Sequence, residues 1–311
     1  TPIFYSTNIS MSLKKKFKFK DRLIKGIDPN GQFKISVVKT TDVVRTAQKN
    51  HNLSLLNTIL LGKTLTSAML LASELKGEER IQIRIDGDGP VGMLTAEANR
   101  VGEVRGYSSN PSVELDYSNP DTTISKGLGN GVLTVTKTLY NEADPRRSSI
   151  ALVNGDINSD IAHYMAQSEQ VLSAFLLDVS LNDDGSVKHA GGVLLQRLAE
   201  ADEESVEKLQ ETLTKLPPLG ELFENDYYID DIMKVATQPF SVKELDRQPV
   251  HFFCRCSPKR FKNALSMLGY EELKEMQGES QEVVCNYCGS KVEISEEEIS
   301  EMAKNAKAKM N

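Results

Sequence analysis

The chain has 311 residues, of which 39% are hydrophobic and 26% are charged. This is the composition of a globular protein, and the length predicts two or three domains. The formal net charge of −7 argues against a nucleic-acid partner, because general nucleic-acid binders carry a basic excess. No apolar stretch approaches the roughly 18–20 residues of a membrane span, so we expect no membrane partner.

The beginning of the chain is rich in lysine. Residues 1–20 contain five lysines and no acidic residue, and we expect them to form a disordered extension in which Met11 is a candidate natural start. We find no signal peptide with an apolar core. Close cysteine pairs without such a signal favour a reducing compartment, so we expect a cytoplasmic protein. Organellar targeting is the alternative, although such presequences favour arginine.

Short β-rich runs alternate with helical segments over residues 21–198. Strands are predicted at residues 32–38, 80–85, 91–96, 102–107, 131–136, 174–180 and 190–196, and helices at 41–50, 59–75 and 159–168. The Gly-rich run at residues 86–92 lacks the Lys-Ser/Thr of a phosphate-binding loop and predicts a turn between strands. Strands beside strands with helices between them predict an α+β fold, with an N-terminal α/β layered domain.

Residues 199–248 differ sharply in charge from the rest of the chain. They contain 13 acidic and 5 basic residues, a net charge of −8. Val206, Leu209, Leu213 and Leu216 form one thin apolar stripe, which Pro217 ends. We therefore predict a charged helical linker with little apolar surface to bury, which would be marginally stable by itself.

Residues 249–311 form the last predicted domain. Ser257 followed by Pro258 is typical of a helix start, and Gly269 is the expected residue after the helix end. A second capping pattern, Ser295 with Glu298, predicts a final helix.

All four cysteines of the chain lie in this last domain, as Cys254-x-Cys256 and Cys285-x-x-Cys288 separated by 28 residues. Two chelating pairs brought together by an intervening fold are the pattern of a four-thiolate zinc site. The simpler interpretation is a structural zinc module, and spacing alone favours it. The alternative is a redox switch built on the same metal, because each pair could close a short disulfide after the metal leaves.

Other candidate sites carry less weight. The four histidines are scattered, and only His251 is near the cysteines, where packing or indirect support of the site is a better interpretation than metal ligation. We find no nucleophile elbow, metalloprotease helix or Cys/His nucleophile pattern, so we expect no enzymatic activity.

Seven motifs in fixed order resemble the heat shock protein 33 family of redox-regulated holdase chaperones. They are Gly62–Ala68, Leu75–Gly77, Gly87–Gly92, Gly102–Tyr107, Ser168–Gln170, Ala190–Gly192 and the cysteine pairs. The resemblance covers roughly residues 21–300 and departs from the family at both ends. It implies an α/β domain, a helical linker and a C-terminal zinc domain.

The resemblance also implies a function. A reduced, zinc-bound and inactive form would be oxidised, lose one Zn²⁺ per chain, unfold its linker and hold unfolded client proteins without ATP, as a homodimer, under oxidative stress. We expect the disulfides Cys254–Cys256 and Cys285–Cys288, because neighbouring thiols close the shortest loops. The alternative function is a zinc-ribbon nucleic-acid or translation factor, but residues 249–311 hold nine basic and ten acidic residues and so show no basic excess.

Overall fold

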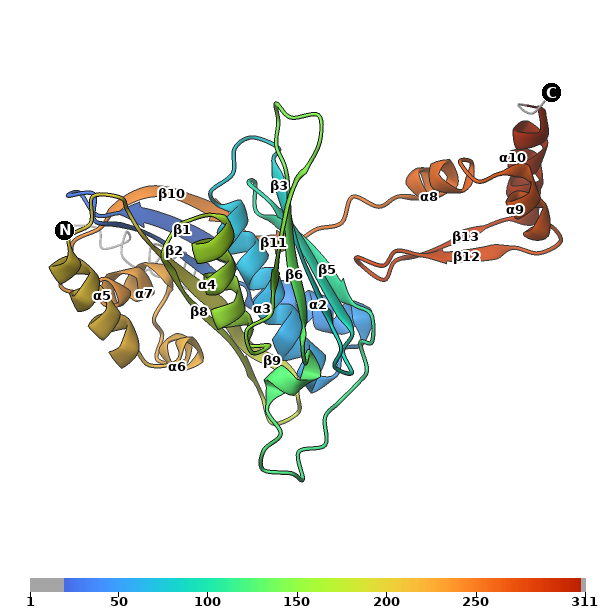
Figure 1. The fold of residues 1–311 in the computed structure, drawn as a ribbon. Helices are drawn as coiled ribbons and strands as arrows, with labels where there is room; N and C mark the ends of the chain where they lie inside the picture. Colours follow the sequence, from blue (N-terminus) through green and yellow to red (C-terminus); the bar gives the residue numbers. More distant parts are fainter. Residues whose placement is uncertain (1–19, 309–311) are drawn as a thin grey trace, which may run out of the picture. The chain divides into compact units, whose positions relative to one another are not determined.

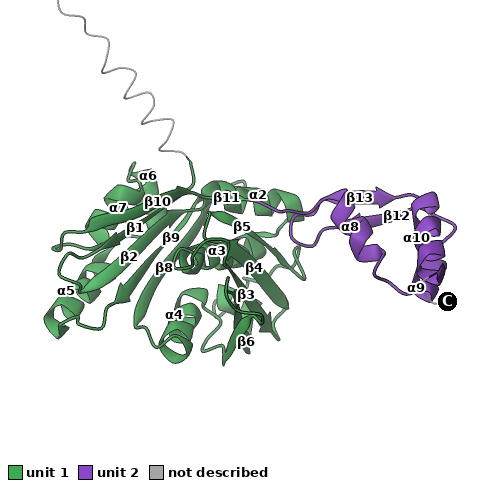
Figure 2. Ribbon diagram, turned by 90° about the horizontal axis from the view of Figure 1, so that it is seen from above, with its two compact units in different colours: residues 1–252 green, residues 253–311 purple. Residues whose placement is uncertain are grey.

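The computed structural model describes residues 20–308 and divides the chain into two compact units (Figure 2). Unit 1 ends at Phe252, and unit 2 begins at Phe253. The expected N-terminal extension lies outside the described residues, apart from Lys20. The predicted boundaries at residues 198/199 and 248/249 stay predictions. In the structure, the segment 199–252 is part of unit 1.

Sheet A of unit 1 has five antiparallel strands in the order β10-β1-β2-β9-β8 (Figure 1). Its strands are β1 (Arg22–Ile27), β2 (Phe33–Lys39), β8 (Ser173–Leu181), β9 (Val187–Arg197) and β10 (Lys243–Pro249). The predicted strands at 32–38, 174–180 and 190–196 are confirmed. The sequence analysis missed strand β10 because Lys243–Pro249 is mostly polar and shows no apolar strand pattern. It lies at the edge of the sheet and forms a strand because it pairs with β1.

Sheet B has six strands in the order β11-β5-β4-β3-β6-β7, and only the β11–β5 pair is parallel. Its strands are β3 (Arg80–Gly87), β4 (Met93–Asn99), β5 (Glu103–Ser108), β6 (Gly131–Thr138), β7 (Arg146–Ala151) and β11 (His251–Phe252). A short 3₁₀ helix, η1 (Ile124–Gly127), precedes β6. The alternating run 80–85 lies in the middle of this sheet, with β4 and β6 on its two sides.

The glycine-rich run between β3 and β4 is a turn, as predicted. A Cβ atom on Gly87 would lie 2.1 Å from the carbonyl oxygen of Leu128, and one on Gly89 would lie 2.6 Å from that of Gly127. Asp88 accepts a hydrogen bond from the Asn130 backbone N–H at 2.7 Å. The glycines therefore allow close backbone packing between two loops, which is a structural role.

Three helices lie between the two sheets: α2 (Thr41–His51), α3 (Leu55–Ala72) and α4 (Ile157–Ser168) (Figure 1). Helix α3 contacts β4 and β5 of sheet B and β8 and β9 of sheet A. It is long and apolar enough to cross a membrane, so the expectation that no stretch approaches that length is wrong. However, 83% of this helix is buried inside the protein, which is the environment of a core helix.

The opposite face of sheet A is covered by the predicted linker. Helices α5 (Glu203–Lys215), α6 (Leu219–Glu224) and α7 (Ile229–Ala236) lie there (Figure 1). Alternation along the strands separates the two faces: Leu23 and Val38 face the central helices, whereas Ile24 and Val37 face the linker.

The expectation that the linker has little apolar surface to bury is wrong. Nine of its residues are buried against sheet A: Leu209, Leu219, Leu222, Phe223, Tyr228, Ile229, Ile232, Met233 and Ala236. Only Leu209 of these belongs to α5, which carries the stripe that the sequence suggested. Most acidic residues of the segment are exposed, and its average composition hides the short apolar faces of α6 and α7.

Unit 2 contains α8 (Pro258–Leu265), α9 (Tyr270–Glu275), the hairpin of β12 (Gln281–Val284) and β13 (Lys291–Ile294), and α10 (Glu296–Ala308). Both predicted helix starts are confirmed: the Ser257 side chain accepts from the Arg260 N–H, and Ser295 and Glu298 cap each other. The predicted stop at Gly269 is wrong. Gly269 has a φ of −69°, outside the left-handed region expected of a residue that follows a helix end, and it is instead the N-cap residue of α9.

Candidate metal centre

The four cysteines of unit 2 come from two irregular segments. Cys254 and Cys256 lie in the extended stretch before α8, while Cys285 and Cys288 lie in the turn between β12 and β13. This turn is tight because the Cys285 carbonyl accepts from the N–H groups of Cys288 (3.3 Å) and Gly289 (2.8 Å). Gly289 has a φ of +68°, which glycine adopts without strain, and so the chain reverses directly after the second thiol.

All four sulfur atoms lie within 4.8 Å of one another. Cys254 Sγ is 3.7 Å from Cys285 Sγ, and Cys256 Sγ is 3.3 Å from Cys288 Sγ. A tetrahedral site with Zn–S bonds of about 2.3 Å requires Sγ–Sγ distances of about 3.8 Å. These are also distances between free thiols, because a disulfide bond would measure about 2.05 Å. The four predicted ligands are therefore together, and their geometry fits a four-thiolate metal site.

The thiols influence one another's ionisation. Burial and hydrogen bonds to Cys288 and Cys254 raise the pKa of Cys256 to about 12, and burial also raises that of Cys285. For Cys288, burial is outweighed by hydrogen bonds from Ser290 and the other thiols, which lower its pKa to about 7. Once one cysteine of the cluster is ionised, its negative charge therefore makes ionisation of the next thiol less favourable. Four thiolates can coexist here only with a cation among them, and a divalent metal supplies that charge.

Ser290 is a site residue that the sequence analysis missed. Its hydroxyl lies 3.2 Å from Cys288 Sγ, and its carbonyl accepts from the Cys285 N–H at 2.9 Å. It thus fixes both cysteines of the turn. Its position two residues after the second cysteine of a Cys-x-x-Cys knuckle was the available signal. His251 lies in β11 of unit 1, where its N–H donates to the Gly102 carbonyl, and it is not a member of the sulfur cluster.

The surroundings of the cysteines contain little hydrocarbon. Apart from Cys288 itself, the buried apolar residues in the described part of unit 2 are Leu273, Ile294, Ile299 and Ala303. Helix α8 has no buried residue. A module of this size normally needs a metal or disulfides to fold, because so small a core does not offset the loss of chain entropy. The cysteine cluster lies where such a crosslink would join α8 to the hairpin.

Comparisons with known proteins agree on one family. A family model described as Hsp33 protein matches residues 21–295. A 33 kDa chaperonin of Desulforamulus reducens is 37% identical over 93% of this chain and 99% of its own length, and one of Streptococcus mutans is 35% identical over 91% and 98%. The crystal structure of the 33 kDa chaperonin of Thermotoga maritima superposes with a TM-score of 0.86 at 32% identity, covering 92% of this chain and 98% of that one.

Proposed function

This chain belongs to the Hsp33 family of chaperones, and we propose that it is a redox-regulated, ATP-independent holdase that binds unfolded proteins during oxidative stress. The proposal of redox regulation rests on two features of unit 2, its cysteine cluster and its small apolar core. Four free thiols converge there in a module that has almost no apolar core. A change in these thiols would therefore change whether the module folds.

In the reduced state, Cys254, Cys256, Cys285 and Cys288 would hold one Zn²⁺. The metal, when bound, balances the negative charge of the thiolates and keeps the two cysteine segments joined. The protein residues set the geometry: the turn around Gly289 positions two sulfurs, and the Ser290 hydroxyl, 3.2 Å from Cys288 Sγ, would donate to that sulfur once it is a thiolate. Thiolates, unlike thiols, react readily with peroxide, so the same site is sensitive to oxidation.

Oxidation would convert each pair of thiols to a disulfide. Two Cys–S⁻ groups would lose two electrons to one hydrogen peroxide molecule, which takes up two protons from the solvent to give two water molecules. We propose the pairs Cys254–Cys256 and Cys285–Cys288, because these thiols are separated by one and two residues. In the folded cluster, however, Cys254–Cys285 and Cys256–Cys288 are also within 3.7 Å. All four sulfurs lie within 4.8 Å of one another, so the folded cluster allows these cross-pair bridges as well, and the short loops are what favour the proposed pairs.

The linker connects this event to an apolar surface. Strand β10 ends at Pro249, the short strand β11 ends at Phe252, and Cys254 follows two residues later, so a change in the fold of unit 2 would begin close in sequence to the end of the linker. Release of the linker would expose the face of sheet A that includes Ile24, Phe33 and Leu195. An apolar sheet face of this kind suits unfolded proteins, whose exposed hydrocarbon is their common property.

We further propose that the oxidised protein forms a homodimer and acts in the cytoplasm without catalysing a reaction. These proposals rest on the family and on the absence of a catalytic motif from the sequence, and the charge of −7 gives no support to a nucleic-acid partner.

Suppression of the aggregation of a chemically unfolded client tests the proposal. Reduced, zinc-loaded protein should be inactive, and protein treated with hydrogen peroxide at mild heat should suppress aggregation and release one equivalent of zinc. A variant in which all four cysteines are serine is the control for non-specific oxidation, because peroxide should leave its activity unchanged. Equal activity of the reduced and oxidised wild type would refute redox regulation while leaving the chaperone assignment in place.

Mass mapping of the oxidised protein tests the disulfide pairing separately. We expect mainly Cys254–Cys256 and Cys285–Cys288. A majority of Cys256–Cys288 bridges would show that the proposed pairing is wrong.

A further inference from the structure

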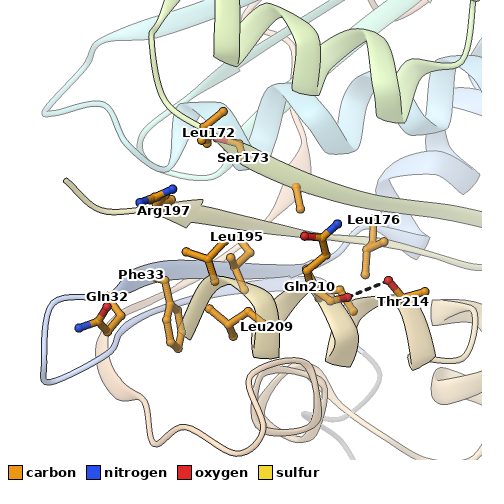
Figure 3. Close-up of a pocket in the computed structure, with 13 residues that line it drawn as sticks. Gln32, Phe33, Leu172, Ser173, Leu176, Leu195, Arg197, Leu209, Gln210 and Thr214 are labelled. Carbon is orange, nitrogen blue, oxygen red and sulfur yellow. Dashed lines mark hydrogen bonds between the residues drawn. The ribbon is translucent and has the colours of Figure 1, made fainter. Parts of the chain in front are cut away.

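Helix α5 does not pack directly onto sheet A along its whole length. A cavity of about 410 Å³ lies between the helix and strands β2, β8 and β9 (Figure 3). Its lining is largely apolar and includes Phe33, Ala174, Leu195, Val206, Leu209 and Leu213. Ligand-binding cavities of proteins have this size and this mainly apolar character.

Arg197 is the one fully charged residue in the lining. Figure 3 shows it at one end of the cavity, whereas Leu176 and Thr214 lie toward the other end. Its guanidinium Nη2 donates hydrogen bonds to the Ala201 carbonyl at 3.0 Å and to Glu203 at 2.9 Å. The guanidinium is planar and presents five N–H donors, and it recognises carboxylates through paired hydrogen bonds.

Of the two partners of Arg197, the charged one, Glu203, is weakly held. The Glu203 side chain is 78% exposed, and an ion pair with so exposed a partner contributes little, because solvent screens it. A ligand carboxylate could therefore replace Glu203 at little cost. The other acidic residues of α5 are directed outward: Glu204 and Glu211 are 79% and 71% exposed and form ion pairs with lysines of the same helix.

From this arrangement we infer that the cavity under α5 binds a medium-chain monocarboxylate, with its carboxylate on Arg197 and its alkyl chain between Leu209 and the sheet. A cavity of roughly 150 Å³ accommodates benzene in an engineered core, so 410 Å³ has room for a chain of about ten carbons. The ligand would contact both α5 and sheet A. It would therefore hold this helix on the sheet, where its own buried contacts are few.

The test uses reduced, full-length, zinc-loaded protein and three ten-carbon probes below their micelle concentrations: decanoate, decanol and decyltrimethylammonium. We expect one decanoate per chain, binding about tenfold more tightly than decanol, and the cationic probe weakest. Arg197→Gln should reduce decanoate affinity about tenfold and leave decanol unchanged. The matched control is Arg84→Gln, which removes an exposed arginine of sheet B that pairs with Asp86 and should change neither affinity.

A second variant tests the apolar part of the site. Ala174→Leu places extra methyl groups in the cavity and should weaken decanoate and decanol alike. Amide hydrogen exchange should show that decanoate protects residues 203–215 and not α2, which lies on the other side of sheet A. Several equivalents of decanoate per chain, equal affinity for the anionic and cationic probes, or unchanged affinity in Arg197→Gln would each overturn the inference.

Discussion

The two units of the protein obtain their stability in different ways. In unit 1, helix α3 is buried between two sheets, and its buried residues, among them Leu61, Leu65 and Met69, belong to one continuous core. Among residues 253–308 of unit 2, only Leu273, Ile294 and Ile299 are large buried aliphatic side chains. Unit 2 instead has a cluster of four cysteine thiols within 4.8 Å of one another. Burial of hydrocarbon is insensitive to oxidants, whereas a metal–thiolate crosslink is not, so the redox sensitivity that we propose would be confined to unit 2.

Removing the metal should have the largest effect, because it should destabilise unit 2 and leave unit 1 folded. Treatment of the reduced protein with a zinc chelator should unfold residues 253–308 and leave α3 and sheet B protected. Metal binding contributes roughly 10–16 kcal/mol to folding in small zinc modules, far more than the few buried side chains here. Hydrogen exchange with mass spectrometry measures both units together, and added zinc should restore protection. Persistence of a folded unit 2 without metal would show that its few apolar contacts suffice.

Truncating a buried side chain of the linker, which creates a new cavity against sheet A, should have the next largest effect. Ile232 of α7 is fully buried against sheet A, and Ile232→Ala should weaken linker packing by about 2–5 kcal/mol. We expect faster exchange in residues 203–236 and client holding by the reduced protein. Val235→Ala on the same helix is the control, because Val235 is only half-buried and its loss should matter less. If the linker opens in Ile232→Ala but reduced protein holds no client, linker release is not the activating step.

The third prediction concerns the pH dependence of unfolding, which depends on the buried carboxyl group of Asp21 in unit 1. Burial raises the pKa of Asp21 to about 7 from 3.8, and the attraction of Lys39, whose Nζ is 3.7 Å from Oδ1, offsets this only partly. The folded state therefore binds the proton more tightly than the unfolded state, and this stabilisation is lost as pH rises from about 4 to 7. Between pH 5 and 7, the unfolding free energy of wild type should fall by about 2 kcal/mol relative to Asp21→Asn.

Urea unfolding of wild type and Asp21→Asn at pH 5, 6 and 7 measures this difference. The amide retains an oxygen that can accept from the Val43 N–H, as Oδ2 does at 2.9 Å, so the cap of α2 is kept. A difference that is constant over this pH range would mean that the carboxyl does not titrate there.

The smallest predicted effect concerns Ser290. Ser290→Ala removes the hydroxyl 3.2 Å from Cys288 Sγ and should raise the pKa of that thiol. Loss of such a supporting contact typically lowers metal affinity about tenfold. Competition with a chromophoric chelator measures the affinity, and Ser280→Ala at the opposite end of the same hairpin, where Ser280 bonds Glu293, is the control. Equal affinities for both variants would assign Ser290 to turn geometry alone.

The sequence by itself determined the metal-site candidates and much of the local structure. Two close cysteine pairs in a chain with no other cysteine have few chemical uses, so their grouping could be predicted from spacing. Strict alternation of residues 80–85 fixed a strand, and Ser257 and Ser295 fixed two helix starts, because these signals act within a few residues. The α+β fold follows from such local elements.

Only the tertiary structure decided how the linker is held and where the thiols lie relative to one another. Strand β10 is polar and exists because β1 offers it an edge, and the buried faces of α6 and α7 are too short to stand out in an acidic segment. The cross-pair sulfur distances and the Ser290 contact depend on a turn whose shape the spacing of cysteines does not specify. In each case the deciding partner is distant in sequence or set by backbone geometry, so local patterns carry little information about it.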